Sequence, residues 1–312
     1  MSRGEDTDEL FTWPPAFDHL IRGNQAWLAE RGETIIGSGC FRSGQLSGSV
    51  HTNFGPEDQD KDTNQDYVVA WLPHDEKTRK RFRFVLAMAD GLTTSFRSEW
   101  AAALVCSIAL RALVEGDPGL PPKDLARYAF DEAGQSLGRI ADELAGDPEA
   151  SCPPGQFVST WKYILRKGGL FQSTLTLAWL DQHFLRVAMV GDGGAVWRSC
   201  RAAPDGQQAN DRVLAQCDLH QHQVCALGPA DRNVREFDCW HEEKLNGPFL
   251  CALHTDGVGR GLGGNPMSLL DELEGMKCPD EENTARRFIE RAIHERPRTF
   301  EDNLTLAVIR AD

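Results

Sequence analysis

The stretch FVLAMADG at residues 84–91 predicts a core strand that ends in a carboxylate. Phe and Val are typical strand residues, and a strand is expected over residues 82–88. Asp90 follows the apolar run, so the edge of a sheet would hold this carboxylate rigidly. Gly91 then lets the backbone turn sharply or approach a ligand closely.

The same arrangement of an acid beside an apolar run recurs along the chain. The other acids at the ends of such runs are Asp66, Asp192, Asp256 and Asp302. A single Asp-Gly pair is usually a turn, but carboxylates brought together raise each other's pKa unless a cation compensates them. Oxygen ligands select Mg²⁺ or Mn²⁺ over zinc. The pattern therefore indicates a site for hard divalent cations.

The order of the other expected elements indicates the fold class. Helices are expected where apolar side chains recur at helical spacing, over residues 98–114, 124–144 and 284–295. Further strands are expected over 67–72, 249–254 and 304–309, with a hairpin formed by 170–180 and 184–190. This order lacks the regular β-α-β alternation of a parallel sheet. We therefore expect an α+β domain of antiparallel sheets with helices packed outside them.

Composition favours a soluble, cytoplasmic protein. The chain has 312 residues and is 41% hydrophobic, which is enough for a core. Its apolar runs are too short to span a bilayer, and residues 1–10 are too acidic and polar for a signal peptide. In the absence of an internal repeat or long linker, we expect one folded body over residues 46–312. Residues 1–45 are expected to form an N-terminal arm packed on that body.

Charge and cysteine content narrow the classes of partner. The net charge of −14 repels nucleic acid and anionic membrane surfaces, so neither is expected as a partner. Nine cysteines, an odd number without a C-x-x-C pair, fit a reducing compartment. One cluster carries zinc-type ligands at unusually tight spacing: Cys217, His220, His222 and Cys225. A polar loop is the preferred interpretation of this cluster, with a structural zinc as the alternative.

A set of short motifs occurs in an order that resembles a known family. The motifs are Asn64-Gln65-Asp66, Ala89-Asp90-Gly91, Ser98-Glu99, Ser173-Thr174-Leu175, Val190-Gly191-Asp192, Thr255-Asp256-Gly257 and Asp302-Asn303-Leu304-Thr305. Over about residues 50 to 310 the chain is similar to the metal-dependent protein phosphatases of type 2C, the PPM family, as a divergent, bacterial-like member. The resemblance implies a four-layer α-β-β-α sandwich, two antiparallel sheets between helices, with residues 46–312 as the catalytic domain.

The resemblance also implies a reaction and a set of site residues. The family hydrolyses phosphoserine and phosphothreonine in proteins, the products of Ser/Thr kinases in signalling, with a metal-bridged hydroxide. By the resemblance, Asp90 would bridge two Mg²⁺ or Mn²⁺ ions, and the carbonyl of Gly91 would complete one of them. Asp256 and Asp302 would ligate the other ion. Asp66 would hold metal-bound waters, and Asp192 would serve a third, weaker metal.

Four positions depart from the family pattern. Lys61 stands where an Arg usually grips the substrate phosphate, and it can attract phosphate only as a point charge. Gln65 replaces an acid beside Asp66, and residues 92–96 lack the His that can protonate a leaving group. Arg260 stands where an acid often supports the third metal.

These departures keep two alternatives open. The first is a catalytically weak or inactive regulatory module that has the same fold and binds phosphoproteins. The second is a metal-dependent hydrolase that acts on a small phosphoester. The retained acids Asp66, Asp90, Asp256 and Asp302 favour an active enzyme over the regulatory module, and the small-phosphoester hydrolase stays open as an alternative.

Overall fold

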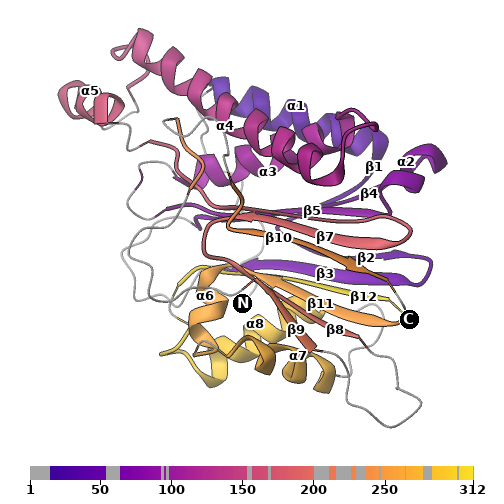
Figure 1. Cartoon of the computed structure of the whole chain (residues 1–312). Coiled ribbons are helices and arrows are strands. Elements are labelled where there is room, and N and C mark those ends of the chain that lie inside the picture. Colours follow the sequence, from indigo (N-terminus) through magenta and orange to yellow (C-terminus); the bar gives the residue numbers. More distant parts are fainter. Residues whose placement is uncertain are drawn as a thin grey trace, which may run out of the picture.

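Two antiparallel sheets stack face to face, with helices on their outer surfaces (Figure 1). The computed structural model describes residues 15–53, 64–92, 95, 98–152, 157–167, 170–199, 211–215, 226–229, 236–245, 247–263, 265–276, 283–300 and 302–311. Within these residues each sheet has six strands. The resulting four layers confirm the predicted α+β sandwich.

The first sheet has the strand order β1-β4-β5-β6-β7-β10, and all its neighbours are antiparallel. Its strands are β1 (Gly32–Ile36), β4 (Asp66–Pro73), β5 (Phe84–Asp90), β6 (Leu175–Leu180), β7 (Phe184–Val190) and β10 (Cys239–Lys244). The predicted hairpin is confirmed as β6 and β7, which pair antiparallel. Its first strand is shorter than expected, since residues 170–174 precede β6.

The second sheet has the order β2-β3-β12-β11-β8-β9 and is also antiparallel. Its strands are β2 (Ser38–Ser43), β3 (Leu46–Asn53), β12 (Leu304–Ala311), β11 (Phe249–His254), β8 (Gly194–Ser199) and β9 (Asp211–Ala215). The two strands expected here from the sequence, β11 and β12, lie side by side at its centre.

Helices cover the outer face of each sheet. Those associated with the first sheet are α1 (Pro15–Arg31), α2 (Glu76–Arg81), α3 (Ser98–Glu115), α4 (Pro122–Gly146) and α5 (Val158–Lys167). Those on the second sheet are α6 (Asp256–Gly261), α7 (Pro266–Gly275) and α8 (Thr284–Glu295). Figure 1 shows α3 lying directly on the first sheet, with α1 and α4 packed on it. The predicted helices are confirmed as α3, α4 and α8.

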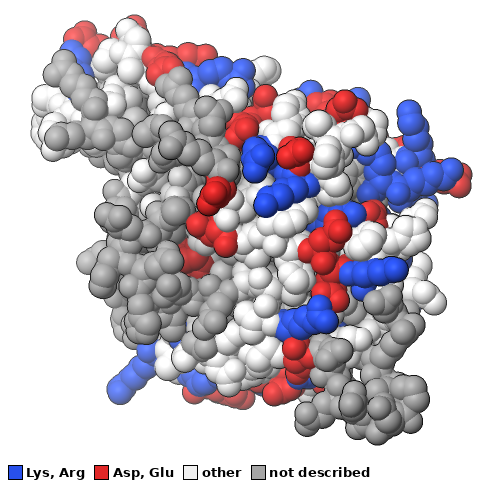
Figure 2. Space-filling model, viewed as in Figure 1, with Lys and Arg blue, Asp and Glu red and all other residues white. Residues whose placement is uncertain are grey.

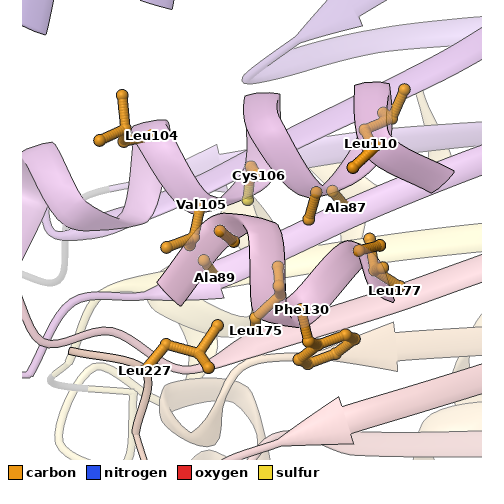
Figure 3. Packing of buried hydrophobic residues seen from close by; sticks show 14 of the residues in the cluster. Ala87, Ala89, Leu104, Val105, Cys106, Leu110, Phe130, Leu175, Leu177 and Leu227 are labelled. Atoms are coloured by element: carbon orange, nitrogen blue, oxygen red, sulfur yellow. The ribbon is translucent and has the colours of Figure 1, made fainter. Parts of the chain in front are cut away.

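The central strands are continuously apolar because both of their faces are covered. In β5, Phe84, Leu86 and Met88 point into the core between the two sheets. The alternate residues of β5, Val85, Ala87 and Ala89, pack instead against the helices. Figure 3 shows this second core, where Ala87 and Ala89 meet α3 side chains such as Cys106. Full burial of one large aliphatic side chain contributes about 1.5–3 kcal/mol, so this strand is fixed firmly beneath the helices.

The N-terminal residues join both sheets. The indole Nε1 of Trp71 in β4 donates to the carbonyl of Leu28 in α1, at 3.0 Å. Gly32 lies against the Trp71 ring, where a Cβ would come within 2.3 Å of the indole nitrogen. Strands β1 and β2 then add to the edges of the two sheets. The boundary between arm and body at residue 45 stays a prediction.

The surface and the remaining sequence expectations complete the fold. On the face seen in Figure 2, acidic and basic side chains are interspersed, and the basic residues of α2 gather at one edge. Among the described residues, no helix is both long and apolar enough to cross a membrane. The cluster interpreted as a polar loop, with a structural zinc as the alternative, lies outside the described residues: Cys217, His220, His222 and Cys225.

Candidate active site

The first pair of predicted site residues meets at one end of the first sheet. Strand β4 begins at Asp66 and the antiparallel β5 ends at Asp90, which makes the two residues register partners. The two carboxyl groups are close enough to interact, because burial raises the pKa of Asp90 and the charge of Asp66 raises it further. Asp66 is only 4% exposed. Antiparallel pairing of neighbouring strands therefore brings both acids together.

The second pair forms in the same way in the second sheet. Strand β11 ends just before Asp256, and the antiparallel β12 begins just after Asp302. Thr255 N donates to the carbonyl of Thr305 at 3.1 Å, which ties the two chain segments together beside the acids. Asp256 is 5% exposed, and burial raises its pKa, with a further rise from the negative charge of Asp302. Asp302 is thus placed next to Asp256.

A threonine links the two pairs across the sheets. The Thr255 hydroxyl donates to Asp66 Oδ2 at 2.8 Å, and the same hydroxyl oxygen accepts from Thr305 N at 3.1 Å. Asp90 and Asp256 also lie close together, since the charge of Asp256 adds to the effect of burial in raising the pKa of Asp90. The four acids predicted from the sequence therefore form one cluster where the ends of the two sheets meet.

Burial and mutual repulsion make this cluster difficult to ionise. Burial raises the pKa of Asp66 to about 7, and hydrogen bonds from its neighbours oppose the rise only partly. The pKa of Asp90 lies well above its ordinary value because of burial first and the charges of Asp66 and Asp256 second. Burial also raises the pKa of Asp256. The cluster needs either protons or a cation to be stable at neutral pH.

Asp192 lies at the margin of the same cluster. It follows β7, and burial raises its pKa to about 6, with a further rise from the charge of Asp256. The turn before it requires glycine, because Gly191 has φ +118° and a Cβ there would come within 2.5 Å of Thr174. The amide of Gly191 donates to Asp238 Oδ2 at 2.7 Å. Asp192 is thereby held where it feels the charges of both Asp256 and Asp302.

The backbone of Asp90 is held by two hydroxyl residues from the start of β6. Asp90 N donates to Thr174 Oγ1 at 2.9 Å, and Thr174 N donates to the Asp90 carbonyl at 2.8 Å. The Ser173 hydroxyl donates to the same carbonyl at 2.9 Å. The sequence identified Ser173 and Thr174 only as part of a motif. Their function in positioning Asp90 depends on the pairing of β5 with β6, which the motif alone does not reveal.

Gly91 fits a space that excludes any side chain. A Cβ at Gly91 would come within 2.6–2.8 Å of Ser98, the first residue of α3. Its amide donates to the carbonyl of Gln65 at 3.0 Å, which links it to the residue before Asp66. Gly91 therefore packs the end of β5 against the start of α3 and against β4.

Arg260 is close to two of the acids of the site. From the sequence, Arg260 was named only as a departure from the family pattern and was not included among the site residues. It lies four residues after Asp256 in α6, and its Nη2 is 2.5 Å from Asp256 Oδ2. Its Nη1 is 3.1 Å from Asp302 Oδ2, so one guanidinium joins both acids. The i,i+4 spacing from Asp256 was the available signal, since residues at this spacing share a helix face. The contact with Asp302 is long-range and has no local signal.

The donor chemistry of the cluster fits a hard divalent cation, although the side chains are not arranged around one. Among the described residues, no three His, Cys, Asp or Glu side chains stand ready to hold a metal ion. Asp256 and Asp302 are engaged by Arg260, and burial together with the charges of Asp66 and Asp256 raises the pKa of Asp90. Yet Asp66 Oδ1 is buried and has no hydrogen-bond donor within the part of the chain that the structure describes. Oxygen-only donors of this kind are those that Mg²⁺ and Mn²⁺ take.

Two parts of the predicted site lie beyond the structural description. Lys61, the expected phosphate-binding residue, falls in residues 54–63, which are outside the described residues. Of residues 92–97, the structure describes only Leu92 and Ser95. Ser95 Oγ accepts from the amide of Gln172 at 2.9 Å. The role of Lys61 therefore stays a prediction.

Comparisons with known proteins agree with this architecture. The family described as protein phosphatase 2C matches the chain over residues 58–288. A similar fold occurs in PppA, a regulatory component of the type VI secretion system of Pseudomonas aeruginosa, with TM-score 0.57 and 16% identity over 86% of this chain and 98% of that one. The catalytic domain of the serine/threonine phosphatase PstP, in complex with two manganese ions, gives 0.56 and 18% over 86% and 99%.

A third similar structure is the serine/threonine phosphatase Stp1 from Staphylococcus aureus, with TM-score 0.56 and 15% identity over 85% of this chain and 94% of that one. At these identities the likeness concerns the fold alone. No curated protein sequence matches the chain.

Proposed function

This chain belongs to the protein phosphatase 2C family, and we propose that it hydrolyses phosphoserine and phosphothreonine in proteins at the carboxylate cluster. One observation carries the proposal: two pairs of strand-end acids from different sheets, Asp66 with Asp90 and Asp256 with Asp302, converge on one point. A buried group of like charges is costly without a cation, so its presence supports metal-dependent chemistry. Phosphoproteins made by a Ser/Thr kinase are the proposed substrates, and a cytoplasmic location stays a prediction.

Metal binding is proposed at the same residues. Asp90 and the carbonyl of Gly91 would hold one Mg²⁺ or Mn²⁺ ion, and Asp90, Asp256 and Asp302 a second. Asp192 would serve a third, weaker ion. The two manganese ions of the PstP catalytic domain, which shares the fold, support this proposal. When bound, two divalent cations lower the pKa of water and offset charge on a phosphoryl group during in-line attack.

The protein's contribution is to fix the positions of the acids. Ser173 and Thr174 hold both backbone polar groups of Asp90, which limits movement of its carboxylate. The Thr255 hydroxyl orients Asp66 by donating to Oδ2, and the other oxygen, Oδ1, is buried without a donor among the described residues. Such constraint matters because a misplacement of about 1 Å can cost about 100-fold in rate. Lys61 is proposed to attract the substrate phosphate.

One observation favours a second candidate, a weakly active or inactive module that binds phosphoproteins. Arg260 already supplies a positive charge to Asp256 and Asp302, so these acids have a partner without any metal. If that ion pair persists in the presence of metal, the fold would be retained without turnover. The two candidates make different predictions for hydrolysis.

The test is phosphate release from an aryl phosphate and from a phosphothreonine peptide, with and without Mn²⁺. Wild type is compared with Asp90→Asn and Asp256→Asn, which should each abolish turnover. Asp75→Asn is the control, because Asp75 is an exposed N-cap of α2 and Asn also serves as a cap. Because residues 92–96 lack a His, we expect the peptide to react more slowly than the aryl ester, whose leaving group needs no proton.

Each outcome distinguishes the candidates. Hydrolysis of both substrates that needs Mn²⁺ and is lost in both site variants supports the phosphatase. Hydrolysis of the aryl ester alone points to a small-phosphoester hydrolase. Bound Mn²⁺ without any hydrolysis supports the regulatory module, and an active Asp90→Asn/Asp256→Asn double mutant would remove the proposed mechanism.

A further inference from the structure

The guanidinium of Arg260 stands between two acids that are proposed to hold the same metal ion. Its two terminal nitrogens reach different carboxylates, Asp256 at 2.5 Å and Asp302 at 3.1 Å. Asp256 is nearly buried, with 6% of its side chain exposed, whereas the Arg260 side chain is 54% exposed. The guanidinium therefore reaches a buried acid from the solvent side of the site.

The helix that carries Arg260 is fixed in place. Gly257 lies so close to the backbone of Asn303 that a Cβ would come within 2.1 Å of the carbonyl oxygen. Gly261, at the other end of α6, lies against the ring of Phe300, and Val258 between them is fully buried. Backbone movement of α6 is consequently restricted. The long, half-exposed side chain of Arg260 is the part that can turn outward into solvent.

A divalent cation at the proposed centre and this guanidinium need the same two carboxylates. Asp256 Oδ2 and Asp302 Oδ2 accept the two Arg260 contacts, and a metal at this half of the cluster would draw on these carboxylates. A positive charge at this distance also repels an incoming cation. Since an oxygen-ligated metal and an arginine cannot occupy one position, binding of one has to displace the other.

We infer that Arg260 is an internal counter-ion that holds Asp256 and Asp302 in the metal-free protein and swings outward when a divalent cation enters. The inference rests on the proposed metal centre of Asp90, Asp256 and Asp302. Arg260 stabilises the metal-free fold by neutralising the two acids, and by the same contacts it weakens metal affinity. Metal occupancy of this site then responds to metal concentration over a higher range than the acids alone would give.

The experiment compares Arg260→Met with wild type and with a matched control. Arg286→Met is the control because Arg286 also pairs with an acid at i,i+4, Glu290 at 2.7 Å, and its side chain is 59% exposed. Mn²⁺ affinity is measured by titration calorimetry on EDTA-treated protein, and unfolding temperature is measured with and without Mn²⁺. Arg260→Lys, which retains the charge without the two-pronged contact, is a second variant in case the methionine variant folds poorly.

We expect Arg260→Met to bind Mn²⁺ about tenfold more tightly, which corresponds to about 1.4 kcal/mol. Its metal-free unfolding temperature should fall, and the increase caused by Mn²⁺ should exceed that of wild type. Arg260→Lys should lie between the two, and Arg286→Met should bind Mn²⁺ as wild type does.

The outcomes separate this inference from the proposed function. Equal Mn²⁺ affinity and equal metal-free stability in wild type and Arg260→Met would overturn the inference while leaving the metal centre intact. Mn²⁺ binding by Arg260→Met but not by wild type would support the inference in its strongest form. Absence of Mn²⁺ binding in wild type and both Arg260 variants would reject the metal centre itself, and the inference with it.

Discussion

Gly257 provides a sharp test of how the site is assembled. It is the second residue of α6, and a Cβ at this position would lie 2.1 Å from the carbonyl oxygen of Asn303 and 3.2 Å from Asp302 Cβ. Ordinary close contacts between carbon and a carbonyl oxygen are about 3.3–3.6 Å, so Gly257→Ala requires a displacement of more than about 1 Å. The contact is with backbone, which cannot rotate away as a side chain can. Overpacking of this kind costs about 1–3 kcal/mol.

The displacement should separate the two acids that flank this contact. Asp256 moves with α6 and Asp302 moves with the segment before β12, so their shared site widens. At about 2–4 °C per kcal/mol, the unfolding temperature should fall by about 2–12 °C. Mn²⁺-dependent phosphate release should fall by about 100-fold. Circular dichroism melting and phosphate release from an aryl ester measure the two effects on the same sample.

A matched substitution controls for the added methyl group. Gly146 is the last residue of α4, and a Cβ there would meet no atom of the described residues within 4 Å. Gly146→Ala should leave activity unchanged and stability equal or higher by up to about 1 kcal/mol. If Gly257→Ala melted and hydrolysed substrate like wild type, the contact would relax locally, and the claim that Gly257 sets the Asp256–Asp302 geometry would be refuted.

Three further predictions concern Thr174, the ion pairs of Arg198 and the titration of Asp66. Thr174→Val removes the acceptor of Asp90 N and should lower kcat more than it raises KM, with recovery in Thr174→Ser; equal kinetics in all three proteins would contradict the positioning role. Arg198→Met should lower the unfolding temperature by several degrees, because the Arg198 side chain is only 9% exposed and its ion pairs join β8 to Asp211 in β9 and to α7. An unchanged unfolding temperature would show that these ion pairs do not contribute to stability. The folded pKa of Asp66, about 7, exceeds the unfolded value of about 3.9, so the metal-free fold binds more protons than the unfolded chain between these values. The stabilising contribution of Asp66 is therefore complete below pH 4 and lost as pH rises through 7. Denaturant unfolding across this range should show the free energy of unfolding decline, and Asp66→Asn should reduce the slope of that decline.

The sequence predicted the elements whose local pattern is strong. Strand β5 was recognisable because both of its faces are buried, which makes every residue from Phe84 to Ala89 apolar. Helix α8 was predicted with the bounds that it has, because its apolar residues keep one face and Asn283 caps its start with a bond to Arg286 N at 2.8 Å. In both elements the information lies within the segment itself.

Other elements depend on partners that the local sequence does not reveal. Strand β3 has the sequence LSGSVHTN and forms because β2 and β12 pair with it on either side. Strand β10, with the sequence CWHEEK, is a charged strand that pairs with β7 at the edge of its sheet. Their backbone hydrogen bonds come from residues far away in the chain, so propensity alone does not identify them.

The same distinction applies to the site. That each acid stands at the end of a strand could be predicted from the residues around it. That Asp66 faces Asp90, and Asp256 lies beside Asp302, depends on which strands are antiparallel neighbours, and only the family resemblance supplied that information. The contact of Arg260 with Asp302 is a tertiary side-chain contact and was missed for the same reason.

The energetics of the cluster indicate why Arg260 and a metal are alternatives rather than additions. Burial and mutual repulsion raise the pKa of Asp66, Asp90 and Asp256, so ionising all of them destabilises the fold. One guanidinium offsets only part of this charge, and it acts on Asp256 and Asp302 but forms no ion pair with Asp66 or Asp90 in the described part of the chain. Two divalent cations would compensate the acids of both pairs. At neutral pH the metal-bound arrangement is therefore favoured if the electrostatic gain from the metal ions exceeds the cost of releasing Arg260 into solvent. That balance decides between a phosphatase and a module that only binds phosphoproteins.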